Sequence, residues 1–161
     1  MAVVYAARHR DLGSLHAIKQ LKVDKESVTD RLLQEGRLQS SLRHPNVVSV
    51  TDLITIENAP ALVMEYVKGP TLGQLLSRQQ LTLHQCDLLA RGILKGVEAA
   101  HAHGMVHRDL KPANILIAST ETDVTPKIAD FGLAKMLETD GDPHGLTKEG
   151  ATMGTPGYMA P

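Results

Sequence analysis

The stretch that decides the fold is His107-Arg-Asp-Leu-Lys-Pro-Ala-Asn114, which brings a carboxylate, two cations and a carboxamide into one loop. It directly follows a segment with the apolar period of a helix. A second polar motif, Asp130-Phe-Gly132, comes sixteen residues after Asn114 and again follows a short apolar run. Functional side chains concentrate on loops that regular elements hold in place, so these two motifs predict a site with chemistry.

The segments before this loop predict a β-rich first part with one helix. Runs of β-prone residues bounded by turn residues predict strands at 2–7, 15–19, 47–54 and 60–67. Leucines at three- and four-residue steps predict a helix over 28–42. Gly36 weakens this helix by about 1 kcal/mol relative to alanine, which predicts a weakly anchored helix.

A long helix is predicted to follow. Thr82-Leu-His-Gln85 has the pattern of a capping box, and Gly104 is expected to end the helix. One stripe of this helix carries the residues expected to face the core, namely Cys86, Leu89, Ile93, Val97 and Ala100. Short strands are predicted at 114–117 and 127–129. The order of elements therefore predicts an α+β chain in two lobes, with residues 1–67 as a β-rich lobe ending in a hinge strand, residues 68–161 as a helical lobe, and the hinge at 65–69.

Composition excludes several classes of protein. The formal net charge of −1 gives no global positive field for nucleic acid or an anionic membrane, and aromatic residues make up only 2% of the chain. Cys86 is the only cysteine, so no disulfide forms within the chain, and no apolar run reaches the length of a membrane span. We therefore expect a soluble, cytoplasmic segment that does not bind nucleic acid.

Further motifs lie in order around the central loop. His16-Ala-Ile-Lys19 ends a predicted strand, Glu35 lies on the following helix, and Gly154-Thr-Pro-Gly-Tyr-Met-Ala-Pro161 follows a threonine-rich loop. Together with the two polar motifs, these resemble the eukaryotic-like (bacterial-type) serine/threonine protein kinases over residues 1–161. The resemblance implies a bilobal kinase fold that transfers the γ-phosphate of ATP to serine and threonine hydroxyls of protein substrates, and it allows dimerisation of the full-length protein.

The resemblance also implies roles for the polar residues, taken from the general template of protein kinases. Asp109, Lys111 and Asn114 are the expected catalytic residues: Asp109 orients the substrate hydroxyl and accepts its proton, and Lys111 lies near the γ-phosphate. Asn114 and Asp130 supply the hard oxygen ligands that Mg²⁺ prefers.

ATP is expected to lie between the predicted lobes. By resemblance, Lys19 holds the α- and β-phosphates while paired with Glu35. The hinge run Val63-Met-Glu-Tyr-Val67 resembles the strand that binds adenine. In that strand Met64 is the gatekeeper and the backbones of Glu65 and Val67 face the base, whose two apolar faces are covered by Val4, Ala17 and Leu116.

Regulation is expected in the loop after Asp130. Arg108 places the chain in the class whose activation loop is often ordered by a phosphate that an arginine can pair with. Thr147 and Thr152 are the candidate phosphorylation sites. Thr155 in Gly-Thr-Pro, together with Lys111-Pro112, favours a serine/threonine over a tyrosine kinase.

Two alternatives remain beside an active kinase. The glycine-rich loop of the family is missing before Val4, and the Ala-Pro-Glu motif stops at Pro161, which predicts a domain incomplete at both ends. Such a chain could be an inert kinase fragment or a pseudokinase-like module that binds a nucleotide or a partner. In it, we expect the apolar stripe of the long helix to be partly uncovered. The other alternative is a metal-dependent hydrolase built on His101, His103 and His107.

Overall fold

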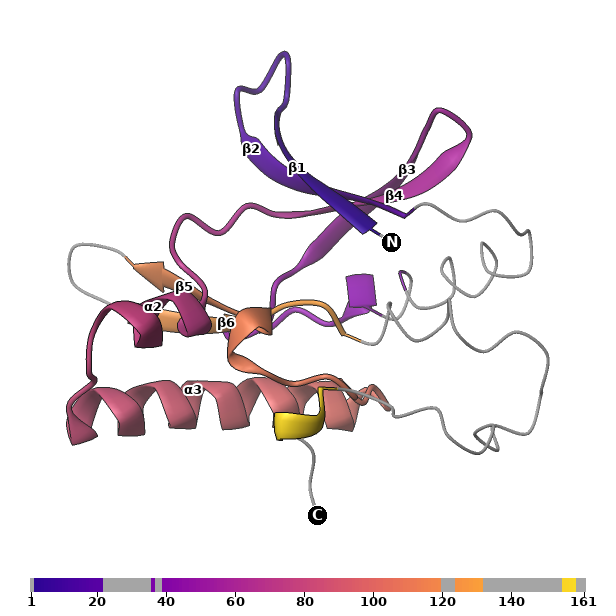
Figure 1. The fold of residues 1–161 in the computed structure, drawn as a ribbon. Helices are drawn as coiled ribbons and strands as arrows, with labels where there is room; N and C mark the ends of the chain where they lie inside the picture. The colour runs from indigo at the N-terminus through magenta and orange to yellow at the C-terminus, as the bar shows by residue number, and fades with distance from the viewer. Residues whose placement is uncertain (1, 22–35, 37–38, 120–123, 132–154, 159–161) are drawn as a thin grey trace.

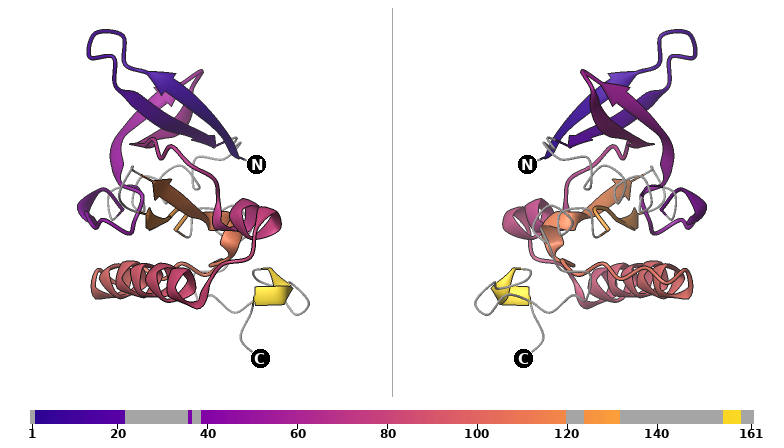
Figure 2. Two further views of the ribbon diagram at one scale, coloured as in Figure 1. Left: turned by 90° about the vertical axis from the view of Figure 1, so that its left-hand side faces the viewer. Right: turned by 90° about the vertical axis from the view of Figure 1, so that its right-hand side faces the viewer.

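A computed structural model of the chain describes residues 2–21, 36, 39–119, 124–131 and 155–158. A four-stranded antiparallel sheet lies at one end of the described structure and a long helix at the other, with a two-stranded sheet between them (Figures 1 and 2). This arrangement confirms the predicted α+β, bilobal class. Within the described residues, no helix is both long and apolar enough to cross a membrane.

The four-stranded sheet is built from two hairpins. Its strands are β1 (Ala2–Arg8), β2 (Leu15–Leu21), β3 (Val50–Ile56) and β4 (Ala59–Glu65), in the order β1-β2-β4-β3. All four strands were predicted, with ends shifted by a few residues. Glu57 and Asn58 join β3 to β4 and both have positive φ, which a two-residue hairpin turn of this twist requires. One face of the sheet carries a buried cluster of Val48, Val50, Leu62 and Met64.

The predicted helix over 28–42 lies largely outside the described residues, but its last turn is visible. Gly36 and residues 39–41 are helical, and both Gly36 and Gln39 are buried. A methyl group added at Gly36 would stand 3.1 Å from Leu62 Cδ2, so the glycine allows the helix to approach β4 closely. Both residues are thus packed in this turn, and the weak anchoring of the helix as a whole stays a prediction.

The second part of the chain contains two helices. Helix α3 (Leu83–Ala102) begins at the predicted capping box of Thr82 and Gln85, and Gly104 with its positive φ of 71° follows its end. Helix α2 (Leu72–Arg78) was not predicted, although Thr71 and Gln74 form the same kind of capping box. Its short length of seven residues gave too little periodicity to identify.

The apolar stripe of α3 is partly covered and partly exposed, as expected. Leu89 and Ala100 are buried, and Ile93 and Val97 pack against the core clusters around them. Cys86 is exposed and does not belong to the core. Cys86 lies in the first turn of α3, one turn before Leu89. The buried part of the stripe starts only at Leu89.

The two-stranded sheet links the lobes. Strands β5 (Ile115–Ser119) and β6 (Val124–Ile128) are antiparallel and are both longer than predicted. The Ile128 N–H donates to the Asn46 carbonyl at 2.8 Å, and the Val48 N–H donates to the Ile128 carbonyl at 2.9 Å. Gly96 lets α3 pack beneath this junction, since a methyl group there would stand 2.8 Å from the Asn46 carbonyl oxygen. The segment 46–48 is thereby fixed to β6. It leads into the four-stranded sheet, called the upper sheet below, while β5 and β6 form the lower sheet.

Candidate active site

Lys19 is the charged residue that the upper sheet brings toward the site. It lies on β2, directly opposite Val4 of β1 and Leu62 of β4, so these three residues share one face of the sheet. Only 6% of Lys19 is exposed. Its Nζ lies 2.7 Å from Asp130 Oδ1, and this ion pair joins residues that are far apart in the sequence. A buried ammonium needs such a partner because desolvation is costly for a charge.

Asp130 follows directly after β6 and Ala129. Its φ of 63° is unusual for a residue other than glycine, and strain of about 1–3 kcal/mol at such a position persists only where the surroundings enforce it. The surroundings here are visible on both sides: the Ala129 N–H donates to the Asn114 carbonyl at 2.9 Å, and Phe131 is buried. The backbone is thus bent so that the carboxylate turns toward Lys19.

His107 supports this bend from below. Its Nε2 lies 2.8 Å from the Ala129 carbonyl oxygen, and its ring lies 4.9 Å from that of Phe131. Burial lowers the pKa of His107, and this effect outweighs the hydrogen bond to Ala129 and the nearby carboxylates, which raise it. A neutral imidazole therefore connects the two polar motifs, with its Nδ1 accepting from the Asp109 N–H at 3.3 Å.

Asp109 is the centre of a polar cluster. Its carboxylate lies 2.7 Å from Lys111 Nζ, accepts from Thr155 Oγ1 at 3.0 Å and accepts from Asn114 Nδ2 at 3.3 Å. Lys111 also donates to Thr155 at 2.9 Å, which closes a triangle. Burial raises the pKa of Asp109, but the hydrogen bonds from Lys111, Thr155 and Asn114 and the charge of Lys111 outweigh this, so that the pKa lies below its ordinary value. Asp109 is ionised at neutral pH.

The loop backbone holds these side chains in place. Residues Pro112–Asn114 form a short 3-10 helix (η1) closed by the Asn114 N–H and the Lys111 carbonyl at 2.9 Å. Arg108 has a φ of 64°, the second strained position of the site. Asn114 Nδ2 donates hydrogen bonds to Asp109. The Oδ1 atom, on the other side of the amide, is thereby left as a potential metal ligand. Oxygen donors from Asn114 and Asp130 are the chemistry that Mg²⁺ prefers, so these residues fit that metal.

The hinge and the two sheets form an apolar site beside these charges. Ala17, Val67 and Leu116, each partly buried, pack against the cluster that contains Met64. Within the described residues, no hydrogen bond takes the backbone N–H or carbonyl of Val67. The Glu65 N–H already donates to the Ser49 carbonyl at 2.9 Å, so this group is not free to bind a base. Val4 is 57% exposed on the same face as Lys19.

Some predicted residues cannot be placed, and one alternative finds no support. Glu35, Thr147 and Thr152 lie outside the described residues. In the part of the chain that the structure describes, no group of three histidine, cysteine or acidic residues could hold a metal ion. His101 and His103 are exposed at the end of α3, whereas His107 is buried and bonded to Ala129. The three imidazoles therefore do not form the site that the hydrolase alternative requires.

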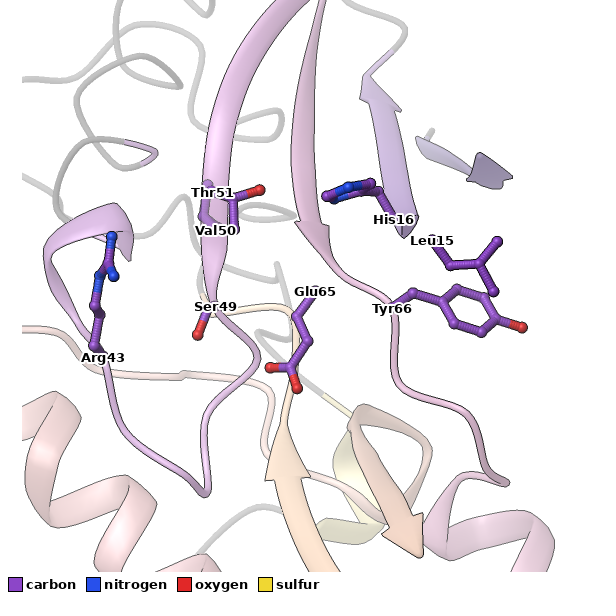
Figure 3. A pocket seen from close by; sticks show the side chains of 8 residues that line it. All are labelled: Leu15, His16, Arg43, Ser49, Val50, Thr51, Glu65 and Tyr66. Atoms are coloured by element: carbon purple, nitrogen blue, oxygen red, sulfur yellow. The ribbon is translucent and has the colours of Figure 1, made fainter. Parts of the chain in front are cut away.

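Sequence reasoning missed three features of this region. Thr155 was assigned to regulation and substrate class, but its hydroxyl contacts Asp109 directly. Lys127 was not singled out, yet its Nζ lies 2.9 Å from Glu65 Oε1 and 3.0 Å from Oε2. A lysine inside a short strand, three residues before Asp130, was the available signal. A cavity of about 420 Å³ behind the hinge, lined in part by Glu65 and Arg43, was also not anticipated (Figure 3).

Comparison with known proteins identifies the family. A family model described as the protein kinase domain matches residues 1–161, and the chain belongs to this family. Serine/threonine-protein kinase PkaA of Streptomyces coelicolor is 40% identical over 153 residues, which cover 92% of this chain and 27% of that protein. Serine/threonine-protein kinase pkn3 of Myxococcus xanthus is 36% identical over 168 residues, which cover 100% of this chain and 30% of that protein. The chain thus spans less than a third of the length of these relatives.

A solved structure is also similar. A crystal structure of Rad53 in complex with AMP-PNP matches with a TM-score of 0.73 and 32% sequence identity, over 82% of this chain and 35% of that one. The order of the sheets and helices described above is therefore that of the protein kinase fold.

Proposed function

We propose that this chain contains the nucleotide, metal and proton-transfer residues of a serine/threonine protein kinase, which transfers the γ-phosphate of ATP to hydroxyls of protein substrates. The observation that carries the proposal is the cluster of Asp109, Lys111 and Thr155 next to the Lys19–Asp130 ion pair. One cluster offers a carboxylate and a cation to a hydroxyl, and the other offers a cation and a metal ligand to phosphate. Phosphoryl transfer depends mainly on such positioning and charge stabilisation.

The reaction follows from the arrangement. Asp109 accepts a hydrogen bond from the substrate hydroxyl and takes its proton as the hydroxyl oxygen bonds to the γ-phosphorus. The bond from that phosphorus to the bridging oxygen breaks, and ADP leaves. Lys111 is adjacent to Asp109 and neutralises charge on the transferred group. Thr155 Oγ1 donates a hydrogen bond to one carboxylate oxygen of Asp109. This bond fixes the orientation of the carboxylate and therefore the direction of its other interactions.

The nucleotide would lie between the sheets. The backbone of Val67 and the carbonyl of Glu65 face the base, while Ala17, Leu116 and Met64 border it, and Val4 covers it from the outermost hairpin. Lys19 would hold the phosphates, and Glu35 is proposed as its ion-pair partner in the active state. Mg²⁺, bound by Asn114 and Asp130, would neutralise the phosphate charge.

Several further assignments belong to the same proposal. We divide the chain into residues 1–67 as the N-lobe with its hinge strand and residues 68–161 as part of the C-lobe. Thr147 and Thr152 are proposed phosphorylation sites that Arg108 would read. The single cysteine supports a reducing compartment, so we place the protein in the cytoplasm, where its partners are proteins with serine or threonine acceptors.

The test separates chemistry from nucleotide binding in the full-length gene product. Asp109→Asn keeps the shape of the side chain but removes its charge, so transfer of radiolabelled phosphate should fall by about 10²- to 10⁴-fold while Mg·ATP affinity stays nearly unchanged. Asp130→Asn should reduce both. Phosphotransfer at the parental rate by the Asp109 variant would refute the assignment, and a parental protein that binds nucleotide without transfer would favour the inert module.

A further inference from the structure

The Glu65–Lys127 ion pair is a link between the lobes that the proposed reaction does not use. Glu65 is the last residue of β4 in the upper sheet, and Lys127 lies on β6 in the lower sheet. Lys127 Nζ is bonded to both carboxylate oxygens, at 2.9 and 3.0 Å. Figure 3 shows the Glu65 side chain pointing from the hinge toward the two-stranded sheet.

The Glu65 side chain points to the side of β4 that faces away from the proposed adenine site. Side chains alternate between the two faces of a strand, so Glu65 and its partner His16 point away from the face that carries Met64 and Ala17. The cavity of about 420 Å³ on that side is lined by Glu65 and His16 but by neither Lys19 nor Asp130. The side chain of Glu65 is thus separate from the backbone groups of the hinge that meet the base.

Lys127 has a direct connection to both ends of the nucleotide site. It is the register partner of Leu116 in the two-stranded sheet, so the two side chains share the face that borders the proposed adenine site. It also precedes Asp130 by three residues on the same short segment. A displacement of Lys127 would therefore move the apolar border of the base and the metal ligand together.

The burial of Lys127 indicates that the pair has a positional role. Its side chain is only 16% exposed, and that of Glu65 is 33% exposed. Burying a charged pair is often no better for stability than an apolar residue of similar volume. A methionine would fill the same space without this desolvation cost, so stability alone does not explain a lysine here.

We propose that Lys127 is a positioning residue, which through Glu65 fixes the hinge relative to the strand that leads to Asp130 and thereby sets the affinity for ATP. The inference rests on the proposed nucleotide site. The pair holds both ends of that site at one separation before ATP binds, which reduces the ordering that binding requires. The groups around Asp109 are not part of this link, so the effect falls on nucleotide binding more than on the chemical step.

The experiment is a double-mutant cycle in the full-length gene product. Lys127→Met, Glu65→Gln and the double variant are compared for KM and kcat, and for the Kd of a non-hydrolysable ATP analogue. We expect each single variant to raise KM and Kd about three- to tenfold, the double variant to be no worse than either single one, and kcat to change less than about twofold. Lys127→Arg, which keeps the charge, should retain most of the affinity.

A matched pair on α3 serves as the control. Arg91 Nε lies 2.8 Å from Asp87 Oδ2, both side chains are exposed, and neither borders the nucleotide site. Arg91→Met should leave the Kd unchanged. An unchanged or lowered Kd in Lys127→Met, additive effects in the double variant, or equal loss in Lys127→Met and Arg91→Met would each overturn the inference. A parental protein that binds no nucleotide would instead refute the proposed function, so the two failures are distinguishable.

Discussion

Gly69 provides a sharp test of how the hinge is attached to the lower lobe. A methyl group at this position would overlap the carbonyl oxygen of Ile117 and stand 3.0 Å from its carbon. Both atoms belong to the backbone of β5, so no side chain can rotate away. Restoring ordinary contact requires a shift on the order of 1 Å between the hinge and β5. The adjacent hydrogen bond from the Ile117 N–H to the Pro70 carbonyl, at 2.9 Å, would be stretched by this shift.

The magnitude for Gly69→Ala follows from these contacts. Overpacking of this kind costs about 1–3 kcal/mol of the free energy of unfolding, and the weakened hydrogen bond adds about 1 kcal/mol. A misplacement near 1 Å at a site that depends on positioning can cost about 10²-fold in rate. We expect a lower urea midpoint and a fall in kcat/KM for ATP by at least about tenfold.

Gly73→Ala is the control for this experiment. It lies four residues away on α2, and the nearest atom to an added methyl group is at 3.6 Å, an ordinary contact. Alanine in a helix is favoured over glycine by about 1 kcal/mol, so this variant should be as stable as the parent or more so. If Gly69→Ala matched Gly73→Ala in stability and in kcat/KM, the close approach would not constrain the hinge and our reasoning would be wrong.

Three further predictions concern the polar site and its loop. Thr155→Val should lower phosphorylation of a peptide substrate about tenfold in a steady-state assay, because a hydrogen bond to the Asp109 carboxylate is lost, whereas Thr155→Ser should retain most of the rate. Burial lowers the pKa of His107 from 6.5, so the unfolded chain takes up a proton first as pH falls. The free energy of unfolding should therefore be constant above that pH and decline below it in urea titrations, and His107→Phe should flatten the decline. Mass spectrometry of the active full-length protein should find phosphate on Thr147, or more weakly on Thr152, and its absence from both would remove that proposal.

The sequence predicted those parts of the structure that depend on local patterns. Alternating and helical periods located the four strands of the upper sheet and helix α3, and the capping box fixed the start of that helix at Thr82. Helix α2 was missed because its seven residues form only two turns, although Thr71 and Gln74 carried the same capping signal. Cys86 was misplaced because periodicity gives the direction of a helix face but not how far along the helix the neighbouring sheet extends.

The residues of the site also fall into those that local motifs predicted and those that they could not predict. The motifs predicted Asp109, Asn114 and Asp130 as site residues, since each belongs to a short string with a fixed order. They could not show that Thr155 contacts Asp109 across 46 residues of sequence, or that Lys127 contacts Glu65 across 62. Such contacts depend on how segments far apart in the sequence fold together, and one-dimensional spacing does not contain that information.

The Lys19–Asp130 ion pair imposes a condition on how the proposed site works. The two charges that satisfy each other at 2.7 Å are those that the proposed function assigns to phosphate and to metal. Lys19 is almost fully buried, so it cannot leave Asp130 without another anion in its place. Phosphate can supply that anion, and the Asp130 side chain, which is 42% exposed, then becomes free to bind the metal. Nucleotide and Mg²⁺ binding should therefore be coupled, so that each makes the other more favourable. The reason is that phosphate replaces Asp130 as the partner of Lys19, while Mg²⁺ replaces Lys19 as the partner of Asp130.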